Sequence, residues 1–298
     1  MYNKNFYLCK GYNVQKNEKK PLIFYHIPKC AGTTFSVLFS YLFSRSLRIP
    51  GSPFGERKTN IAFEYFLKNK KKIFDYNPNF IYGHFPYEIS EYFSKYLSVT
   101  IIREPVERCI SHFKFLISRN IIKKNSFFEN DYLKYCFENN IITPNVMTRQ
   151  FSSKSFIKDN INENMFLKAR NVLLKEIDLI YDIKNSSDLY NLLISLYDLP
   201  NLFFQEQQKT KNMQLNFDDE KIEIIKKYNE YDIKLYEYLI TNKAPNNIDK
   251  QLSRDVKKYF YSSPDLLINK KKQCLLDESD FVEVKERLKN QNFIIKEF

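Results

Sequence analysis

The sequence predicts an α/β fold in which helices flank a central, mostly parallel sheet. Four apolar runs have the length and composition of buried strands, at residues 21–28, 79–84, 98–103 and 179–183. Segments with helical periodicity separate these runs, and strands that alternate with helices form parallel sheets. Ligands of such sheets bind beyond the carboxyl ends of the strands. The chemistry of this protein is therefore expected where the predicted strands end.

The composition is that of a folded domain with a large core. Of the 298 residues, 43% are hydrophobic and 16% are aromatic, so global disorder is excluded. The net charge of +12 favours anionic partners. Lysine, asparagine and isoleucine are abundant throughout, and this general composition accounts for the larger share of the charge. The charge can help an anionic substrate approach, but it does not identify one.

The chain is expected to contain one large domain with an addition at each end. We expect a polar leader at residues 1–20, the main domain at 21–245 and an extension at 246–298. A helix near 280–288 of this extension is expected either as a small appendage or packed on the core of the domain. The five cysteines lack C-x-x-C spacing and are odd in number, which argues against a disulfide framework and a zinc site. The amino-terminal sequence is too polar for a signal peptide or a membrane anchor. A cytoplasmic protein with reduced thiols is the simplest expectation.

Helices are predicted from apolar spacing and from capping residues. Asp218 and Asp219 precede a long helix with acidic residues in its first turn. Residues 49–55 and 205–214 are expected to be loops because of their Pro, Gly and polar content. The lysine run at 68–72 has no interleaved aromatic residues and indicates a solvated surface rather than a nucleic-acid site. The predicted helices cover residues 33–47, 61–67, 105–117, 127–138, 145–151, 163–175, 187–197 and 218–240.

The segment PLIFYHIPKCAGTT has the pattern of an anion-binding turn. An apolar strand ends at Lys29, and a turn of small residues with two hydroxyls then leads into a helix: Cys30, Ala31, Gly32, Thr33 and Thr34. Such a turn offers backbone N–H groups and a helix N-terminus to an anion. A Walker P-loop has its lysine after the glycines, whereas Lys29 precedes the small residues. An ordinary strand-to-helix turn with an exposed lysine is the alternative, and this motif alone leaves both open.

The motif REPVERCIS is a second candidate anion site. Arg103 ends a strand, Pro105 starts a helix in the favoured position, and Ser111 follows the arginine by two helical turns. A guanidinium and a hydroxyl can bind one phosphate from two sides. In isolation, a surface ion pair of Arg103 with Glu104 or Glu107 is the better interpretation of this motif.

Three predicted strands end at residues that bind anions or transfer protons. The first ends at Lys29, the second at Gly83-His84 and the third at Arg103. Because the carboxyl ends of parallel strands meet at one edge of a sheet, these side chains are expected to converge. The chain has only five glycines and three histidines, so a glycine directly before a histidine indicates a constrained site.

HIPKCAGTT followed by REPVERCISHF resembles the two nucleotide-binding signatures of sulfotransferases that use 3′-phosphoadenosine 5′-phosphosulfate (PAPS). The resemblance is to the branch typified by heparan sulfate 2-O-sulfotransferase, with its bacterial or viral members. Further matches follow in the order of the family: Gly83-His84, NVMTR at 145–149, and the stretch from Tyr228 to Tyr236. The resemblance covers residues 21–240 and implies the P-loop NTPase-like sulfotransferase fold.

The resemblance implies a role for each motif. Lys29 would contact the oxygen that bridges phosphate and sulfate and stabilise the charge that develops there. Arg103 and Ser111 would bind the 3′-phosphate, which distinguishes this donor and its product PAP from ATP. Sulfuryl transfer relies on in-line positioning and charge stabilisation, so no metal is expected. The small-residue turn would hold the 5′-phosphate, and a basic loop would add weaker contacts: Cys30, Ala31, Gly32, Thr33, Thr34, Thr210 and Lys211.

His84 is the candidate base for the acceptor hydroxyl. An imidazole with an ordinary pKa of about 6.5 accepts a proton at neutral pH, and His84 aligns with a catalytic histidine of the family. Family members carry His-Gly-His, whereas Tyr82 stands at the first position here, so a two-histidine arrangement is not implied. Glu88 is the fallback base, four residues further on.

Three other polar residues near these motifs are assigned weaker roles. His26 is expected to pack against or orient the anion-binding turn, and His112 to be structural. Arg149 is expected either to contact an anionic acceptor or to buttress the site.

The sequence therefore predicts a PAPS-dependent sulfotransferase that acts on a hydroxyl, with an oligo- or polysaccharide as the favoured acceptor. Small glycosides and tyrosine also present hydroxyls, and the basic surface weakly favours an anionic sugar. One rival is a P-loop kinase, which needs an acidic residue at a strand end where this chain has Lys, His and Arg. The second rival is a non-catalytic nucleotide- or polyanion-binding module. Neither a nucleic-acid partner nor a membrane span is expected, and no oligomeric state is predicted.

Overall fold

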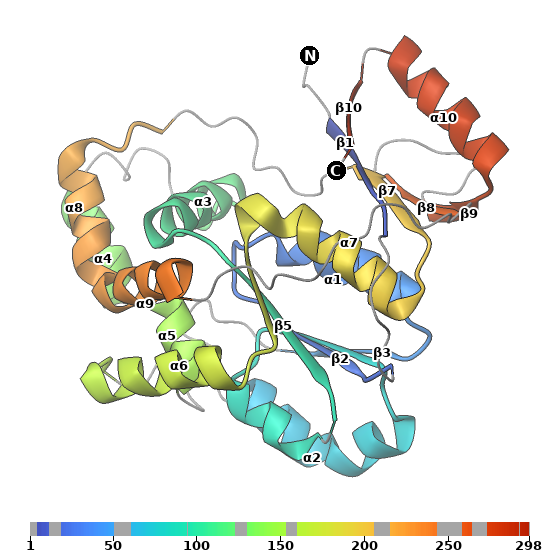
Figure 1. The fold of residues 1–298 in the computed structure, drawn as a ribbon. Coiled ribbons are helices and arrows are strands. Elements are labelled where there is room, and N and C mark those ends of the chain that lie inside the picture. The colour runs from blue at the N-terminus through green and yellow to red at the C-terminus, as the bar shows by residue number, and fades with distance from the viewer. Residues whose placement is uncertain are drawn as a thin grey trace. The chain divides into compact units, whose positions relative to one another are not determined.

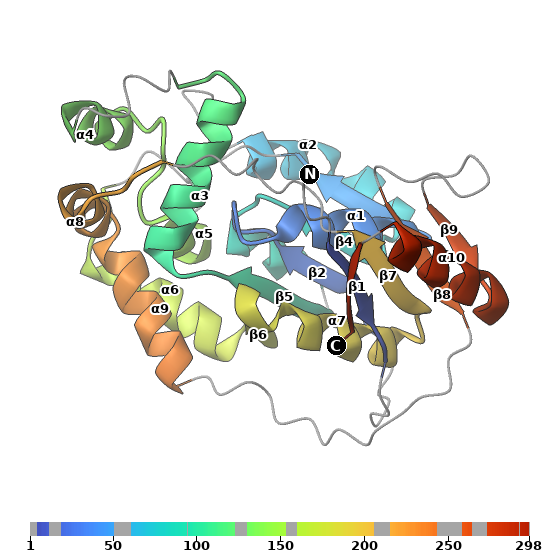
Figure 2. The same cartoon turned by 90° about the horizontal axis from the view of Figure 1, so that it is seen from above.

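The structure is a computed structural model of the chain, which forms two compact units (Figures 1 and 2). The larger unit contains the described parts of 20–183 and 210–246, and the smaller unit those of 1–19, 184–209 and 247–298. The residues described are 5–11, 19–50, 61–93, 95–122, 130–152, 160–205, 215–242, 258–263, 273–291 and 293–297.

A five-stranded parallel sheet forms the centre of the larger unit, as predicted for an α/β fold. The strand order is β3-β4-β2-β5-β6, and every neighbouring pair is parallel. The central strand β2 is buried along its whole length, which explains its continuous apolar sequence. The strands are β2 (Leu22–Tyr25), β3 (Ser46–Ile49), β4 (Phe80–Gly83), β5 (Leu97–Ile102) and β6 (Leu179–Asp182).

Helices cover both faces of this sheet. The α1 residue Phe35 stacks on Phe24 of β2 with ring centroids 4.1 Å apart. Tyr25 points to the opposite face, where its ring contacts Phe85 and the α5 residue Phe151. The helical elements of this unit are α1 (Gly32–Leu42), α2 (Ile61–Tyr76), η1 (Tyr87–Tyr92), α3 (Pro105–Ser118), α4 (Asn130–Glu138), α5 (Val146–Ser152), α6 (Glu163–Lys175), α8 (Asp219–Tyr228) and α9 (Glu230–Asn242), and the short η3 (Ile183–Asn185) follows β6.

The direction of the connections reverses between β2 and β5, which are neighbours in the sheet. The connection after β2 contains α1, on the face of Phe24, whereas the connection after β5 contains α5, on the face of Tyr25. In open parallel sheets, such a reversal leaves a crevice at the carboxyl ends of the two strands. The segments that begin at His26 and at Arg103 emerge at this crevice.

The observed bounds of two helices differ from the predicted ones. The helix expected at 33–47 ends at Leu42, and β3 follows it. Ser46 explains this end, because its hydroxyl donates to the main-chain oxygens of Ser40 and Phe43. These bonds compete with the main-chain hydrogen bonds that would continue the helix. In contrast, the helix expected at 61–67 continues to Tyr76, so the lysine run lies on a helix, with all four lysines exposed as expected.

The predicted helix at 218–240 is two helices that break at Asn229. The side chain of Asn229 donates to the oxygen of Ile225 and accepts from the N–H of Asn145, at 2.9 and 3.2 Å. In return, the Asn145 side-chain oxygen accepts from the N–H of Asp232, and the Asp232 carboxylate accepts from the N–H of Thr148. The first turns of α5 and α9 therefore cap each other. This mutual cap joins the two motifs NVMTR and NEYD.

A mixed five-stranded sheet forms the centre of the smaller unit, in the order β10-β1-β7-β8-β9. The β1 strand lies in the expected polar leader, and β8, β9, α10 and β10 lie in the expected extension, so both terminal segments contribute to this unit. Residues 184–205, expected in the main domain, also belong to it. Its elements are β1 (Asn5–Cys9), α7 (Ser186–Tyr197), β7 (Asn201–Gln205), β8 (Tyr259–Ser262), β9 (Gln273–Leu276), α10 (Glu278–Asn290) and β10 (Ile294–Glu297).

None of the helices that the structure describes combines the length and the apolar character needed to cross a bilayer.

Candidate functional site

The turn between β2 and α1 has an unusual backbone. Lys29 and Ala31 have positive φ angles of 70° and 57°, a region that side chains other than glycine rarely adopt. Gly32 begins α1, and a Cβ atom there would lie 1.9 Å from the ring of His26. The first N–H groups of a helix have no acceptor within it, so those of Gly32 and Thr33 are available for an anion. The turn thus combines a strained backbone with a glycine at the start of the helix, as an anion cradle does.

Lys29 lies against α3 rather than in open solvent. Its Nζ is 4.4 Å from the centroid of the Phe115 ring, and Arg119 lies over the same ring at 5.5 Å. Burial lowers the pKa of Lys29 to about 8, and the charges of Arg103 and Arg119 add to this decrease. The interpretation of Lys29 as merely an exposed lysine is therefore disfavoured, because its charge is desolvated and held among cations.

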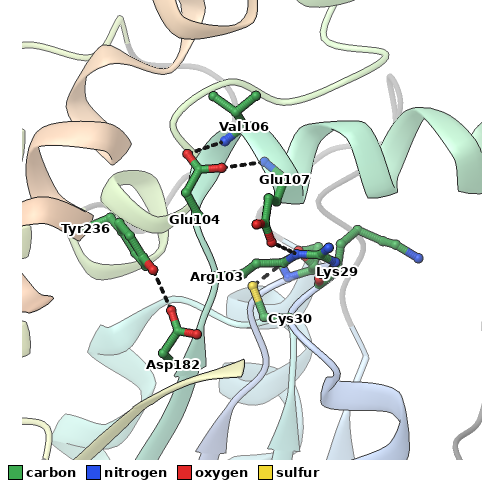
Figure 3. Close-up of polar contacts among 9 residues, drawn as sticks. Lys29, Cys30, Arg103, Glu104, Val106, Glu107, Asp182 and Tyr236 are labelled. Atoms are coloured by element: carbon green, nitrogen blue, oxygen red, sulfur yellow. Dashed lines mark hydrogen bonds and ion pairs between the residues drawn. The ribbon is translucent and has the colours of Figure 1, made fainter. Parts of the chain in front are cut away.

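Arg103 joins this turn from the end of β5 (Figure 3). Its Nη1 donates to the main-chain oxygen of Lys29, and its Nε contacts Glu107, both at 3.4 Å. The ion pair anticipated with Glu107 is thus present, but it is long and the Glu107 side chain is 46% exposed. Glu104 instead caps α3, with its two carboxylate oxygens accepting from the N–H groups of Val106 and Glu107.

Ser111 is partly buried in the middle of α3. In the described structure, no hydrogen bond joins it to Arg103. It is one helical turn before Phe115, and residues four apart share a helix face. Since Phe115 contacts Lys29, the face that carries Ser111 is the face beside the anion cradle.

His84 follows β4 and is held by the strand beside it. Its Nδ1 is 2.7 Å from the main-chain oxygen of His26. A carbonyl oxygen only accepts, so Nδ1 carries the hydrogen and Nε2 is the proton-accepting nitrogen of the neutral ring. Gly83 has a φ of 150°, and a Cβ there would lie 2.3 Å from the oxygen of Ile49. The glycine is therefore required for the turn that presents His84.

Burial also determines the protonation state of His84. It lowers the pKa of His84 to about 4, the hydrogen bond to His26 opposes this decrease, and the charge of Arg48 adds to it. The ring of His26 contacts the His84 ring with centroids 4.1 Å apart, and burial likewise holds the pKa of His26 well below its usual range. Both imidazoles are therefore neutral at pH 7.

Glu88 and Arg149 are both buried. One carboxylate oxygen of Glu88 forms an ion pair with Lys168 of α6 at 3.0 Å. The Nε of Arg149 donates to the main-chain oxygen of Pro144 at 3.0 Å. The ion pair of Glu88 and the burial of Arg149 both fit residues that support the larger unit from within.

A buried charge lies beneath the cradle on α3. Arg108 is fully buried, and its Nη2 donates to the sulfur of Cys109 at 3.0 Å. Burial raises the pKa of Cys30 to about 12, and the charge of Arg108 opposes this rise. The same charge opposes the rise that burial causes in the pKa of Asp232. Arg108 thus connects the anion cradle electrostatically with the mutual cap of α5 and α9.

Sequence reasoning missed three residues of this site and one contact. Phe115 and Arg119 follow Ser111 by four and eight positions, and this helical spacing is the signal that identifies them. Arg48 was missed because β3 was not predicted. Tyr236 donates to Asp182 at 2.6 Å beside the end of β5, a contact that no spacing reveals (Figure 3).

Thr210 and Lys211 lie outside the described residues, so their predicted contacts with the donor stay predictions. His112 is fully buried in α3, where burial holds its pKa well below the usual range. Within the described ranges, no group of three His, Cys, Asp or Glu side chains is placed to hold a metal ion.

Comparison with known proteins agrees with this geometry. The model of the sulfotransferase family matches residues 12–239, which is most of the chain and includes every described candidate residue. The curated proteins contain no match. The activity of the family is the transfer of a sulfuryl group. The chain therefore belongs to the sulfotransferase family.

Proposed function

We propose that this protein transfers the sulfuryl group of PAPS to a hydroxyl of a carbohydrate, with His84 as the base. The observation that carries the proposal is the hydrogen bond from His84 Nδ1 to the His26 oxygen, next to the anion cradle. This bond leaves Nε2 of a neutral imidazole as the proton acceptor, which is the form a general base needs. The proposed fold is the P-loop NTPase-like sulfotransferase fold of the heparan sulfate 2-O-sulfotransferase branch.

The residues of the cradle fit the donor. PAPS has anionic groups at both ends of its ribose, and it supplies the sulfuryl group when bound. The Gly32 and Thr33 N–H groups and the hydroxyls of Thr33 and Thr34 would bind the 5′-phosphate. The N–H of Thr34 donates to the oxygen of Ala31 at 3.1 Å, so the backbone contribution that we propose is smaller than the sequence suggested.

Arg103 and Ser111 would bind the 3′-phosphate. The fork of Arg103 is occupied in part by Glu107, through a contact of 3.4 Å that is longer than a good charge-assisted hydrogen bond. A phosphate carries more charge than a carboxylate and can replace it. Glu104 does not compete, because the N-terminus of α3 occupies both of its oxygens.

Lys29 would stabilise the negative charge that develops on the leaving phosphate oxygen. Its ammonium group is desolvated, and a charge in a site of low dielectric acts more strongly than one in water. His84 Nε2 would take the proton of the acceptor hydroxyl while that oxygen attacks sulfur. The bond between sulfur and the phosphate oxygen then breaks, and PAP leaves with the electron pair.

The first test is calorimetric titration of PAP and of 5′-AMP, which lacks the 3′-phosphate. We expect PAP to bind more tightly than AMP, and Arg103→Ala or Ser111→Ala to remove most of this preference. Arg45→Ala is the matched control, because Arg45 precedes β3 at the opposite edge of the sheet and bonds to the Asn77 oxygen. No binding of PAP, or a preference that survives Arg103→Ala, contradicts the proposed donor site.

The second test measures transfer from labelled PAPS to an array of carbohydrates, small glycosides and tyrosine peptides. We expect His84→Ala to lower kcat by at least about a hundredfold with little change in PAP affinity, since general bases contribute about 10²–10⁴-fold. Glu88→Gln should retain most activity. If His84→Ala retains turnover, Glu88 becomes the candidate base. Magnesium-dependent transfer of phosphate from ATP favours the kinase alternative. PAP binding without transfer to any acceptor identifies a binding module.

A further inference from the structure

His26 connects the donor cradle with the proposed base. It directly follows β2 and precedes Lys29 by three positions. The Cδ2–Nε2 edge of its ring fills the space that a Cβ at Gly32 would occupy. The face of the same ring contacts His84, with centroids 4.1 Å apart and an interplanar angle of 34°. One side chain therefore separates the glycine of the cradle from the base.

The register of the sheet explains why the two rings meet. Phe24 of β2 pairs with Tyr82 of β4, so residues 24 and 82 point to the same face. His26 and His84 come two positions later on the same face. The N–H of His26 also donates to the oxygen of Gly83 at 3.1 Å, which continues the ladder beyond the last strand pair. His26 and His84 are thus the next pair of neighbouring residues after Phe24 and Tyr82 on this face of the sheet.

Two interactions from one residue hold the base. The main-chain oxygen of His26 determines which nitrogen of His84 carries the hydrogen. The ring of His26 limits the rotation of the His84 ring. The Phe24 ring in turn contacts the His26 ring, with centroids 5.7 Å apart. The ring of His26 also fills the space beside Gly32. The position of this ring therefore depends on the native backbone of the cradle.

Among the residues that the structure describes, the arginine and lysine side chains that act on this pair are cationic. Arg48 of β3 lowers the pKa of both imidazoles, and Lys29 contributes to the decrease at His26. His112 of α3 lies near enough to His84 for the charge of one to affect the other. A proton taken up by either imidazole is therefore disfavoured until an anion enters the cradle.

We propose that His26 is a positioning residue that aligns His84 for proton abstraction and couples that alignment to the donor cradle. This inference rests on the proposed function, but its first readout does not require turnover. His26 takes no proton in the reaction and contacts no reacting atom. Its ring acts by contact, and its main-chain oxygen acts through Nδ1 of His84.

The primary experiment is long-range ¹H–¹⁵N correlation spectroscopy of the imidazoles as a function of pH. The chain has three histidines, so His26→Phe and His84→Gln suffice to assign the spectrum. In the wild type, we expect His84 to hold its hydrogen on Nδ1 and to titrate far below 6.5. His26→Ala keeps the main-chain oxygen but removes the ring that limits the rotation of His84, so we expect the titration of His84 to move toward the ordinary value and its tautomer to become mixed. An unchanged titration and tautomer in His26→Ala overturn the proposal.

Kinetics provide the second readout. We expect His26→Ala to lower kcat by about 10- to 100-fold, as expected for a misaligned base, with PAP affinity within about threefold of wild type. His26→Phe retains an aromatic ring and should recover most of kcat. Equal losses in the Phe and Ala variants contradict a role by contact, and thermal melting of both variants excludes unfolding as the cause. If the wild type transfers no sulfuryl group, the proposed function fails. The spectra still show whether His26 determines the tautomer and the titration of His84.

Discussion

Removal of the Asp232 carboxylate tests the mutual cap of α5 and α9. Asp232 is fully buried, and it accepts from the N–H of Met147, the N–H of Thr148 and the Thr148 hydroxyl at 3.0, 2.8 and 2.9 Å. Asp232→Ala leaves these three donors without their acceptor and leaves Arg108 with less compensation. A buried donor that loses its acceptor costs about 1–3 kcal/mol. Because the three share one site and their costs are not additive, we expect a loss of about 3–5 kcal/mol in the free energy of unfolding.

The measurement is urea unfolding followed by circular dichroism at pH 7. Asp232→Asn keeps one side-chain oxygen and should lose less, about 1–2 kcal/mol. Asp131→Asn is the matched control, since its side chain is 95% exposed and its ion pair with Lys134 is 3.4 Å long, so its change should be below about 0.5 kcal/mol. If Asp232→Ala unfolds within about 1 kcal/mol of wild type, the mutual cap does not stabilise the fold as we argue.

Three further predictions concern the site. Lys29 has a pKa of about 8 in the donor-free protein, so PAP should bind more weakly as the pH rises through 8. The side chain in Lys29→Arg keeps its charge, so calorimetry should show that the PAP affinity of this variant does not change between about pH 7 and 9. The three histidines have lowered pKa values in the folded protein, so they bind protons more readily when the chain is unfolded. The free energy of unfolding should therefore fall as the pH decreases from about 6.5 toward 4, with a maximal slope of about 4 kcal/mol per pH unit. A constant free energy of unfolding over this window contradicts the burial of these histidines as neutral groups. Gly83→Ala should lower both the melting temperature and kcat, because the Cβ meets the Ile49 oxygen at a φ of 150°; wild-type kcat in this variant shows that the turn before His84 is not constrained.

The sequence predicts the parts of this fold that are local. The strand β2 is buried on both faces and has a continuous apolar sequence, and β5 is almost equally buried and is apolar except for Ser98 and Thr100. The strand β3 has four residues, of which only Ile49 is buried, and its periodicity is too short to distinguish from the preceding helix. The strands of the smaller unit are equally short and come from three distant segments. Their pairing depends on contacts that no local pattern encodes.

The same distinction applies to the site. Lys29 and Arg103 lie in motifs whose spacing identifies them, and the structure joins them through one hydrogen bond. The contact of His26 with His84 spans 58 positions and depends on the register of β2 with β4. The sequence placed both histidines at strand ends, but only the assembled sheet brings their rings together. Likewise, Arg48 approaches these rings only because β3 is the neighbour of β4.

The mutual cap also determines the order in which this chain can complete its fold during synthesis. The first turn of α5 forms around residues 145–148, but its acceptor is 84 positions further on, at Asp232. The whole segment 184–205, which belongs to the other unit, leaves the ribosome in between. Until Asp232 emerges, the nascent α5 has no carboxylate at its N-terminus, and Arg108 has no buried counter-charge. The parallel sheet and its anion cradle are thus translated early, but the helical layer of α5 and α9 closes only after the middle segment of the second unit has also been translated.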